Sequence, residues 1–147
     1  MNELQTLYQE VLLYHYRSPR NRGRLASATG RAEGHNPLCG DRIAVEVEVA
    51  GERLQGVAFE GAGCAISTAS ASLMTEAVAG RTPTEIAALF EQFRKAVTGD
   101  PTADVEPLGK LAVLCGVKDF PMRVKCATLA WHTLLAALAG GGKVSTE

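Results

Sequence analysis

The chain has 147 residues, of which 46% are hydrophobic and 21% are charged, as in one ordinary globular domain. We therefore expect a single domain over residues 1–147. Its 15 basic and 16 acidic residues give a formal net charge of −1, which disfavours nucleic acid as a partner. The longest stretch without charged residues, 126–142, is shorter than the ~20 strongly apolar residues that a membrane span needs. It predicts a buried helix and no membrane association.

The role of the cysteines depends on whether the protein works in a reducing or an oxidising compartment. The N-terminal stretch MNELQTLYQEV contains acids and no apolar signal core, so we expect a cytoplasmic location. Thiols stay reduced there, which makes Cys39, Cys64, Cys115 and Cys126 better candidates for metal binding or chemistry than for disulfides. The alternative is that they are free cysteines of the core.

The first helix is expected over residues 3–17, with Asn2 as N-cap and Gln5 completing a capping box. Residues 17–31 follow as a loop with five arginines and no acid. Such a loop either docks on an acidic partner surface or is simply solvated.

The remaining chain predicts strands first and helices afterwards. Alternation of apolar and polar residues over 41–49 predicts a strand with one face in water. The expected strands lie within 30–37, over 41–49 and near 53–60, and the expected helices run over 64–79, from Thr82 to Gly99, near 107–115 and over 121–139. Residues 140–147 are expected to form a flexible tail. The fold class is α+β, with a small antiparallel sheet of about three strands covered on one face by helices.

Three short segments contain residues that can carry chemistry. Cys39 and Asp41 are two residues apart just before a strand, so both can project to the same side and bind a metal. The alternative is a turn cysteine beside an aspartate that caps the strand. Cys64 opens a helix after Gly61-Ala62-Gly63, where the helix dipole favours its thiolate, although a tight turn would also suit a small cysteine.

Cys126 lies in the opening turns of the last helix, close to Arg123 and Lys125. We expect these two cations to lower the pKa of the Cys126 thiol and to attract an anionic sulfur species. None of the cysteines forms a C-x-x-C pair, so any metal site must be assembled from distant segments.

These segments resemble motifs of the U-type iron–sulfur assembly proteins. The matching stretches are Asn36-Pro37-Leu38-Cys39-Gly40-Asp41, Gly63-Cys64-Ala65-Ile66-Ser67 and Arg123-Val124-Lys125-Cys126-Ala127-Thr128-Leu129-Ala130-Trp131. Scaffold members of that superfamily have a histidine directly before the third cysteine, where this chain has Lys125. That difference, together with the long segment between Cys64 and Cys126, resembles the zinc-dependent SufU subgroup of the SUF system.

The resemblance implies a set of roles that the spacing alone does not. The implied zinc ligands are Cys39, Asp41, Cys64 and Cys126, with Cys39 as the sulfur acceptor. The implied partners are a pyridoxal-phosphate (PLP) cysteine desulfurase, whose persulfide sulfur the protein takes, and downstream SUF scaffold components. The chain would then be a sulfurtransferase-like second substrate and activator of the desulfurase, with Arg123 as a candidate docking or anion-guiding residue. Whether it counts as an enzyme in its own right stays open.

Two other functions remain open at this point. The chain can be a scaffold that assembles an iron–sulfur cluster, or binds iron, on the same ligands, or a structural zinc domain that modulates a partner. Among the remaining candidates, Cys115, His15 and His132 are expected to pack in the core, and His35 is a candidate for tuning Cys39.

Overall fold

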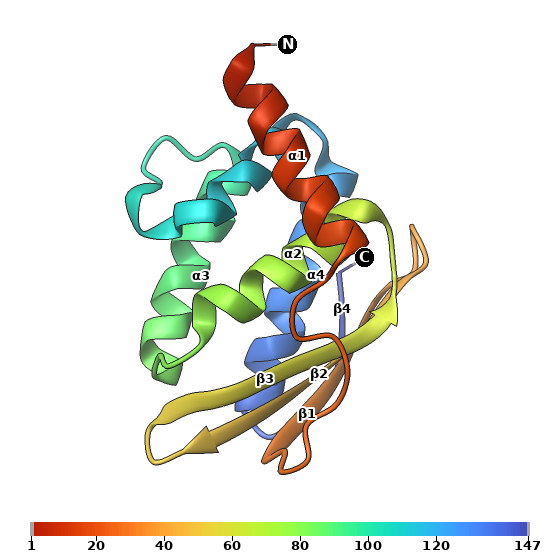
Figure 1. Cartoon of the computed structure of the whole chain (residues 1–147), viewed down its shortest axis with the longest axis vertical. Coiled ribbons are helices and arrows are strands. Elements are labelled where there is room, and N and C mark those ends of the chain that lie inside the picture. The colour runs from red at the N-terminus through yellow and green to blue at the C-terminus, as the bar shows by residue number, and fades with distance from the viewer. Residues whose placement is uncertain (1, 147) are drawn as a thin grey trace.

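The computed structural model describes residues 2–146. The elements in chain order are α1 (Glu3–Arg17), β1 (Gly30–Asn36), β2 (Asp41–Ala50), β3 (Arg53–Ala62), α2 (Ala65–Val78), α3 (Pro83–Thr98), the 3₁₀ segment η1 (Glu106–Asp119), α4 (Pro121–Leu138) and β4 (Gly142–Ser145). The helices pack on one side of a single sheet, and α4 lies directly against β1 and β2 (Figure 1). This confirms the α+β class. Within residues 2–146, no helix is long and apolar enough to cross a bilayer.

The sheet has four strands in the order β3-β2-β1-β4. β1 and β3 are antiparallel to β2, as expected, but β4 is parallel to β1, so the sheet is mixed. The expectations of three strands and of a flexible tail over 140–147 were therefore wrong for Gly142–Ser145. Gly140, Gly141 and Gly142 all have positive φ, which lets the chain reverse after α4 and place its end along the open edge of β1. Residue 147 lies outside the described part of the chain.

Reciprocal N-terminal caps begin α1 and α3, and the cap of α1 is the one that the sequence predicts. The side chain of Asn2 accepts a hydrogen bond from the backbone N–H of Gln5, and the side chain of Gln5 accepts one from the backbone N–H of Asn2. Thr82 and Glu85 form the same reciprocal pair at the start of α3. Each pair satisfies two backbone donors that a helix start would otherwise leave free.

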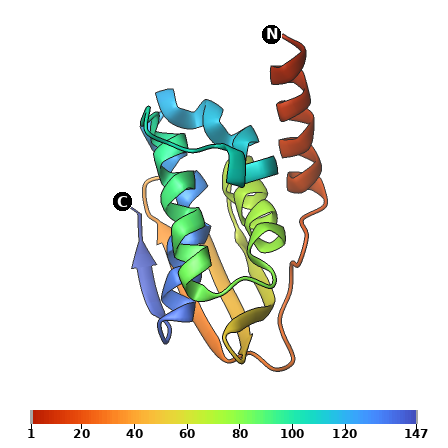
Figure 2. The same cartoon turned by 90° about the vertical axis from the view of Figure 1, so that its left-hand side faces the viewer.

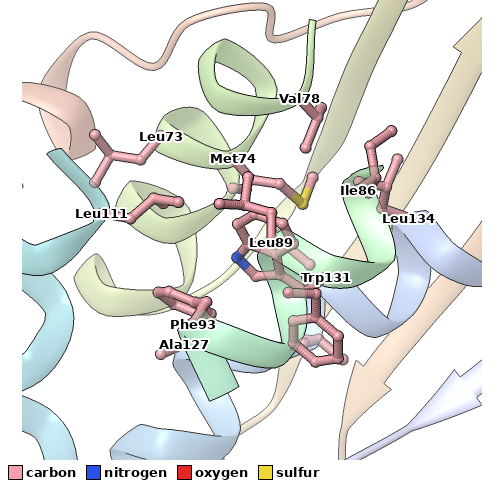
Figure 3. Packing of buried hydrophobic residues seen from close by; sticks show 14 of the residues in the cluster. Leu73, Met74, Val78, Ile86, Leu89, Phe93, Leu111, Ala127, Trp131 and Leu134 are labelled. Atoms are coloured by element: carbon pink, nitrogen blue, oxygen red, sulfur yellow. The ribbon is translucent and has the colours of Figure 1, made fainter. Parts of the chain in front are cut away.

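The core lies between the sheet and helices α2, α3 and α4. The Trp131 ring stacks on that of Phe93, with ring centroids 5.1 Å apart, and both residues are fully buried (Figure 3). Apolar side chains from α2, α3 and η1, among them Met74 and Leu111, surround this pair. Burial of such side chains contributes roughly 1.5–3 kcal/mol each, so this cluster is the main stabilising element of the fold.

Helix α1 stands at one side of the molecule, and a long loop connects it to the sheet (Figure 2). Its one fully buried side chain is His15, whose Nδ1 lies 2.6 Å from the Ser72 hydroxyl, so the expected packing role holds. The basic loop is partly used inside the molecule. Arg24 and Arg31 pair with Glu46, and the backbone N–H of Leu25 donates to the same carboxylate at 2.8 Å.

The alternation over 41–49 predicted that Glu46 faces water. The structure shows instead that Glu46 is only 6% exposed. The loop covers it, because a carboxylate with three donors can be buried at little cost. Those donors lower the pKa of Glu46, first through the Leu25 N–H and then through Arg24.

Candidate metal centre

The turn between β1 and β2 carries Cys39. Gly40, at φ 74°, closes the turn by donating its N–H to the carbonyl of Asn36 at 2.9 Å. The Asn36 side chain accepts the N–H of Leu38 at 3.1 Å. The turn is thus shaped by a left-handed glycine and an asparagine side chain, and it leaves Cys39 exposed.

Asp41 begins β2 and is 1% exposed. Its Oδ1 accepts the backbone N–H of Cys64 at 2.9 Å, and its Oδ2 lies 3.1 Å from the Cys39 sulfur and 3.7 Å from the Cys64 sulfur. A buried carboxylate requires compensating partners, and here they come from two segments of the chain. Asp41 therefore links the turn after β1 to the start of α2.

Cys64 is the N-cap of α2 and is exposed. Its sulfur lies 3.4 Å from the backbone nitrogen of Ser67, which donates to it, as expected for a cysteine at a helix start. The glycines before it allow this close approach. A Cβ on Gly61 would lie 2.1 Å from the carbonyl oxygen of Arg42, and one on Gly63 would lie 3.1 Å from Oδ1 of Asp41.

Cys126 lies near the start of α4 and is only 5% exposed. Its sulfur is 3.3 Å from the sulfur of Cys39. One donor atom each from Cys39, Asp41 and Cys126 lie within 4.8 Å of one another, and the sulfur of Cys64 borders this group through Asp41. The four residues expected from the sequence are therefore brought together from distant parts of the chain.

Both thiols of the Cys39–Cys126 pair are held in their neutral form in the metal-free protein. Burial, followed by hydrogen bonding to Asp41 and Cys39 and the nearby Cys64, raises the pKa of Cys126 far above its usual range. Burial and the Asp41 carboxylate also raise the pKa of Cys39. The expectation that Arg123 and Lys125 lower the pKa of Cys126 was wrong, because burial and the acidic neighbours dominate there.

The donor set fits a divalent metal of borderline softness. Zinc accepts thiolate sulfur and carboxylate oxygen, and three cysteines with one aspartate would supply four ligands. Within residues 2–146, this cluster contains no histidine. A bound metal would compensate the negative charge of the Asp41 carboxylate and of the cysteine thiolates that ligate it.

The other candidate residues lie outside the cluster. Cys115 is half-buried in η1 and packs against the core, as expected, and burial raises the pKa of its thiol. His35 is exposed on β1, and no donor atom of this residue belongs to the cluster. His132 is exposed on α4 rather than packed in the core as expected, although its ring meets Phe90 edge-on and desolvation lowers its pKa.

Three exposed apolar residues, which we call the apolar rim, adjoin the cysteine-bearing segments in sequence and were not predicted. Leu38, Phe120 and Met122 are 58%, 49% and 44% exposed, although each is a large apolar side chain. The Arg123 guanidinium stacks over the Phe120 ring, 4.7 Å from its centroid. The sequence did contain a signal for this exposed surface. All three apolar residues adjoin a turn or helix start that carries a cysteine, where no core position is expected.

Comparison with known proteins places the chain in a family. Residues 7–137 match the model of the NifU-like N terminal domain. The chain is 40% identical over 136 residues to the zinc-dependent sulfurtransferase SufU of Bacillus subtilis, covering 92% of each. It is 38% identical to the iron–sulfur cluster assembly scaffold protein IscU of Streptococcus pyogenes, covering 94% of this chain and 86% of the relative.

A solved structure shows the same architecture. The crystal structure of a candidate iron–sulfur cluster assembly scaffold protein for the SUF system from Fervidobacterium islandicum superposes with a TM-score of 0.84. The two sequences are 34% identical, and the match covers 91% of this chain and 98% of that one. The resemblance to U-type assembly proteins is thereby confirmed, and the chain belongs to the family of the NifU-like N terminal domain.

Proposed function

We propose that this chain takes part in iron–sulfur cluster assembly as a zinc-dependent sulfur acceptor, with Cys39 receiving sulfur from a PLP-dependent cysteine desulfurase. The observation that carries this proposal is the contrast within the cluster. Cys39 is exposed on a turn, whereas Asp41 and Cys126 are buried directly behind it. The Cys39 thiol is thus accessible to a partner, while Asp41 and Cys126 stay in place behind it.

Zinc would be held by Cys39, Asp41, Cys64 and Cys126. When bound, it keeps the thiols deprotonated and joins three distant parts of the chain. The buried carboxylate of Asp41 and the absence of histidine from the described cluster support this ligand set. The Bacillus relative, which is described as zinc-dependent, supports the choice of metal.

Cys39 is the acceptor because its backbone is the least constrained among the three cysteines of the cluster. Cys64 is exposed as well, but it donates its backbone N–H to Asp41 and is the N-cap of α2. Cys126 is buried within α4. In the transfer step, the Cys39 thiolate attacks the outer sulfur of the partner's cysteine persulfide. A sulfur–sulfur bond to Cys39 forms, the bond to the partner's cysteine breaks, and that cysteine leaves as a thiolate.

The apolar rim of Leu38, Phe120 and Met122 is the surface on which the desulfurase would dock. Arg123, at the same place, would guide an anionic persulfide toward Cys39. Docking of this rim would bury exposed apolar area and exclude water from the reacting sulfurs. The onward recipients are components of the SUF system, and the reaction would take place in the cytoplasm.

A scaffold role is the second candidate. Several relatives are named as scaffold proteins, and sulfur and carboxylate ligands also suit iron. Lys125, directly before Cys126, favours the sulfur-acceptor role, because the scaffold members have a histidine there. Anaerobic reconstitution that yields a stable and transferable cluster would favour the scaffold role.

The test combines the zinc-loaded protein, a cysteine desulfurase and L-cysteine. We expect faster alanine formation and a persulfide on Cys39 in peptide mass spectrometry. Cys39→Ser should abolish both effects, whereas Cys115→Ser, the matched control outside the cluster, should leave them unchanged. Unchanged alanine formation together with no added sulfur would rule out the proposal. Sulfur flow that survives Cys39→Ser in a disturbed fold would indicate a structural zinc domain instead.

A further inference from the structure

Cys126 is placed to act on Cys39 as well as to bind metal. The two sulfurs are 3.3 Å apart, which is within reach of a nucleophilic attack. They differ in exposure, since Cys39 faces solvent and Cys126 is 5% exposed. A sulfur atom delivered from outside therefore adds to the outer side of the Cys39 sulfur, and Cys126 stays on its inner side.

We propose that Cys126 is the resolving thiol of Cys39: it attacks the inner sulfur of a Cys39 persulfide and releases the transferred sulfur as sulfide. With the transferred sulfur on the exposed side of Cys39, the attacking Cys126 thiolate and the leaving sulfur would lie on opposite sides of the sulfur that is attacked, which is the arrangement that thiol–disulfide exchange requires. This inference rests on the proposed function, because it takes the Cys39 persulfide as its starting point.

The step balances without an added oxidant. The Cys126 thiolate forms a bond to the Cys39 sulfur, the bond between that sulfur and the outer sulfur breaks, and hydrosulfide leaves with the electron pair. The persulfide's outer sulfur is reduced to sulfide, and the two cysteines are oxidised to a Cys39–Cys126 disulfide. A dithiol reductant must then reduce this disulfide before the next turnover.

Cys64 is not equivalent to Cys126 in this respect. Its sulfur lies outside the group of donor atoms that are within 4.8 Å of one another, and it accepts the N–H of Ser67 at the start of α2. Its sulfur lies 3.7 Å from Asp41 Oδ2 and is also a neighbour of Cys126. The structure therefore selects the Cys39–Cys126 pair, and Cys115, which lies outside the cluster, serves as the matched control.

The experiment loads the full-length, zinc-containing protein with sodium polysulfide, so that no desulfurase is needed. After removal of excess reagent, we expect about one equivalent of sulfide for each Cys39 persulfide lost. Non-reducing peptide mapping of the same sample should show a disulfide between Cys39 and Cys126 in equal amount. The mapping needs no variant, so the result does not depend on whether a cysteine substitution disturbs folding.

The variants sharpen the result. Cys126→Ser should slow sulfide release at least tenfold and retain the persulfide on Cys39, whereas Cys115→Ser, outside the cluster, should still release sulfide and form the Cys39–Cys126 disulfide. Equal release from the two variants, or a wild-type disulfide that joins Cys39 to Cys64, would overturn the inference. If the desulfurase fails to load Cys39 but polysulfide-loaded protein behaves as expected, the proposed partner is wrong and the resolving role of Cys126 stands.

Discussion

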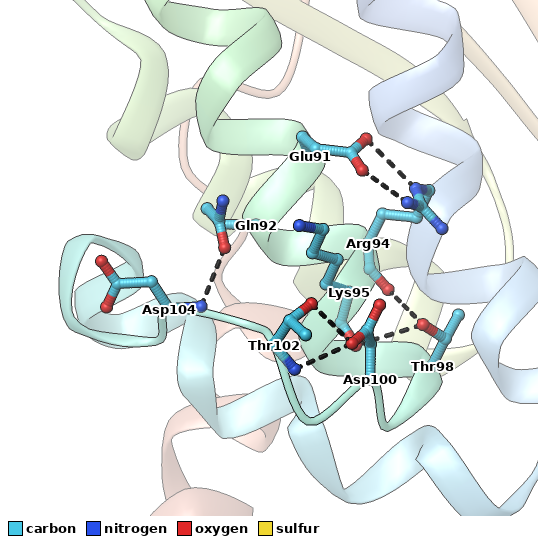
Figure 4. A network of polar contacts seen from close by, with 8 residues as sticks. All are labelled: Glu91, Gln92, Arg94, Lys95, Thr98, Asp100, Thr102 and Asp104. Carbon is cyan, nitrogen blue, oxygen red and sulfur yellow. Dashed lines mark hydrogen bonds and ion pairs between the residues drawn. The ribbon is translucent and has the colours of Figure 1, made fainter.

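Two clusters of polar side chains in this molecule are built in opposite ways. The cluster around Asp100 is local, because all its members lie within residues 91–104 on α3 and the following turn (Figure 4). Asp100 accepts the N–H and hydroxyl of Thr102, and Gln92 accepts the N–H of Asp104. The cluster around Asp41 instead draws on residues far apart in the sequence and encloses a carboxylate that is 1% exposed.

The difference separates a structural feature from a functional one. The Asp100 cluster stays in water, so it orders a turn at little cost, and its hydrogen bonds with Thr102 lower the pKa of Asp100. The Asp41 cluster buries a carboxylate, which carries a desolvation cost, and it raises the pKa of two thiols. A bound metal would offset that desolvation cost, and the Asp41 cluster is therefore the candidate metal centre.

Removal of the metal should have the largest effect on the fold. Structural zinc contributes ~10–16 kcal/mol in small zinc-finger peptides, which is comparable to the stability of a whole domain. We expect a chelator to lower the Tm of the zinc-loaded protein by at least about 10 °C in calorimetry. Restored zinc should restore the Tm. A chelated protein with the same Tm as the loaded one would show that the Asp41 cluster does not hold the fold together.

The substitution Asp41→Ala should have the second largest effect. It removes a ligand and leaves the N–H of Cys64 without its acceptor, which costs roughly 1–3 kcal/mol on its own. We expect zinc to be lost to a chromophoric chelator more readily by a factor of at least about 10–100.

Asp41→Asn is the matched control for this substitution. Its amide oxygen can still accept the Cys64 N–H, so most of the folding stability should return while zinc retention stays weak. Zinc retention equal to wild type in both variants would make Asp41 a strand cap rather than a ligand.

The pH dependence of the metal-free protein should be a smaller effect. Because the pKa values of Cys39 and Cys126 are raised in the folded state, their contribution to stability is full below the thiol pKa of the unfolded chain, about 8.5. It is lost as the pH rises above that value. The Tm of the metal-free protein should therefore fall between pH 8 and 10, more steeply than that of the zinc-loaded protein.

The Cys126→Ala variant tests the source of this pH dependence. Without the buried thiol, the metal-free protein should show a flatter decline in Tm over the same pH range. A decline as steep as in the wild-type chain would place its origin outside the Asp41 cluster. Zinc affinity itself should fall as the pH is lowered, because the ligands must release protons to bind the metal.

Asp100→Ala should have the smallest effect. Its partners are exposed and close in sequence, and water can replace the lost hydrogen bonds. We expect the Tm to fall by no more than about 2 °C and zinc retention to stay unchanged. A change in zinc retention would mean that the two clusters are coupled through α3 and η1, against the separation drawn above.

Much of this molecule was predictable from local patterns. The capping residues Asn2 and Thr82 indicate where their helices begin, and the alternation of apolar residues predicts β2. Both signals depend only on neighbours along the chain. The positions of Cys39, Asp41, Cys64 and Cys126 could be inferred through the family motifs.

What depends on distant segments could not be predicted. The burial of Glu46 depends on a loop that starts before β1, and β4 forms only because the edge of β1 is open to the chain end. The raised pKa of Cys126 likewise follows from tertiary burial, which outweighs the cations next to it in sequence. These three errors share one cause, namely that sequence neighbours do not reveal which surface another segment will cover.

The most direct test of the metal centre is X-ray absorption spectroscopy at the zinc edge of the fully loaded protein. The account predicts three sulfur ligands at about 2.3 Å and one oxygen ligand at about 2.0–2.2 Å. In Asp41→Ala, the three sulfurs should remain while the protein's oxygen ligand is replaced or lost. A site with two or fewer sulfur ligands, or with histidine nitrogen in the first coordination sphere, would contradict the assignment of Cys39, Asp41, Cys64 and Cys126 as the metal centre.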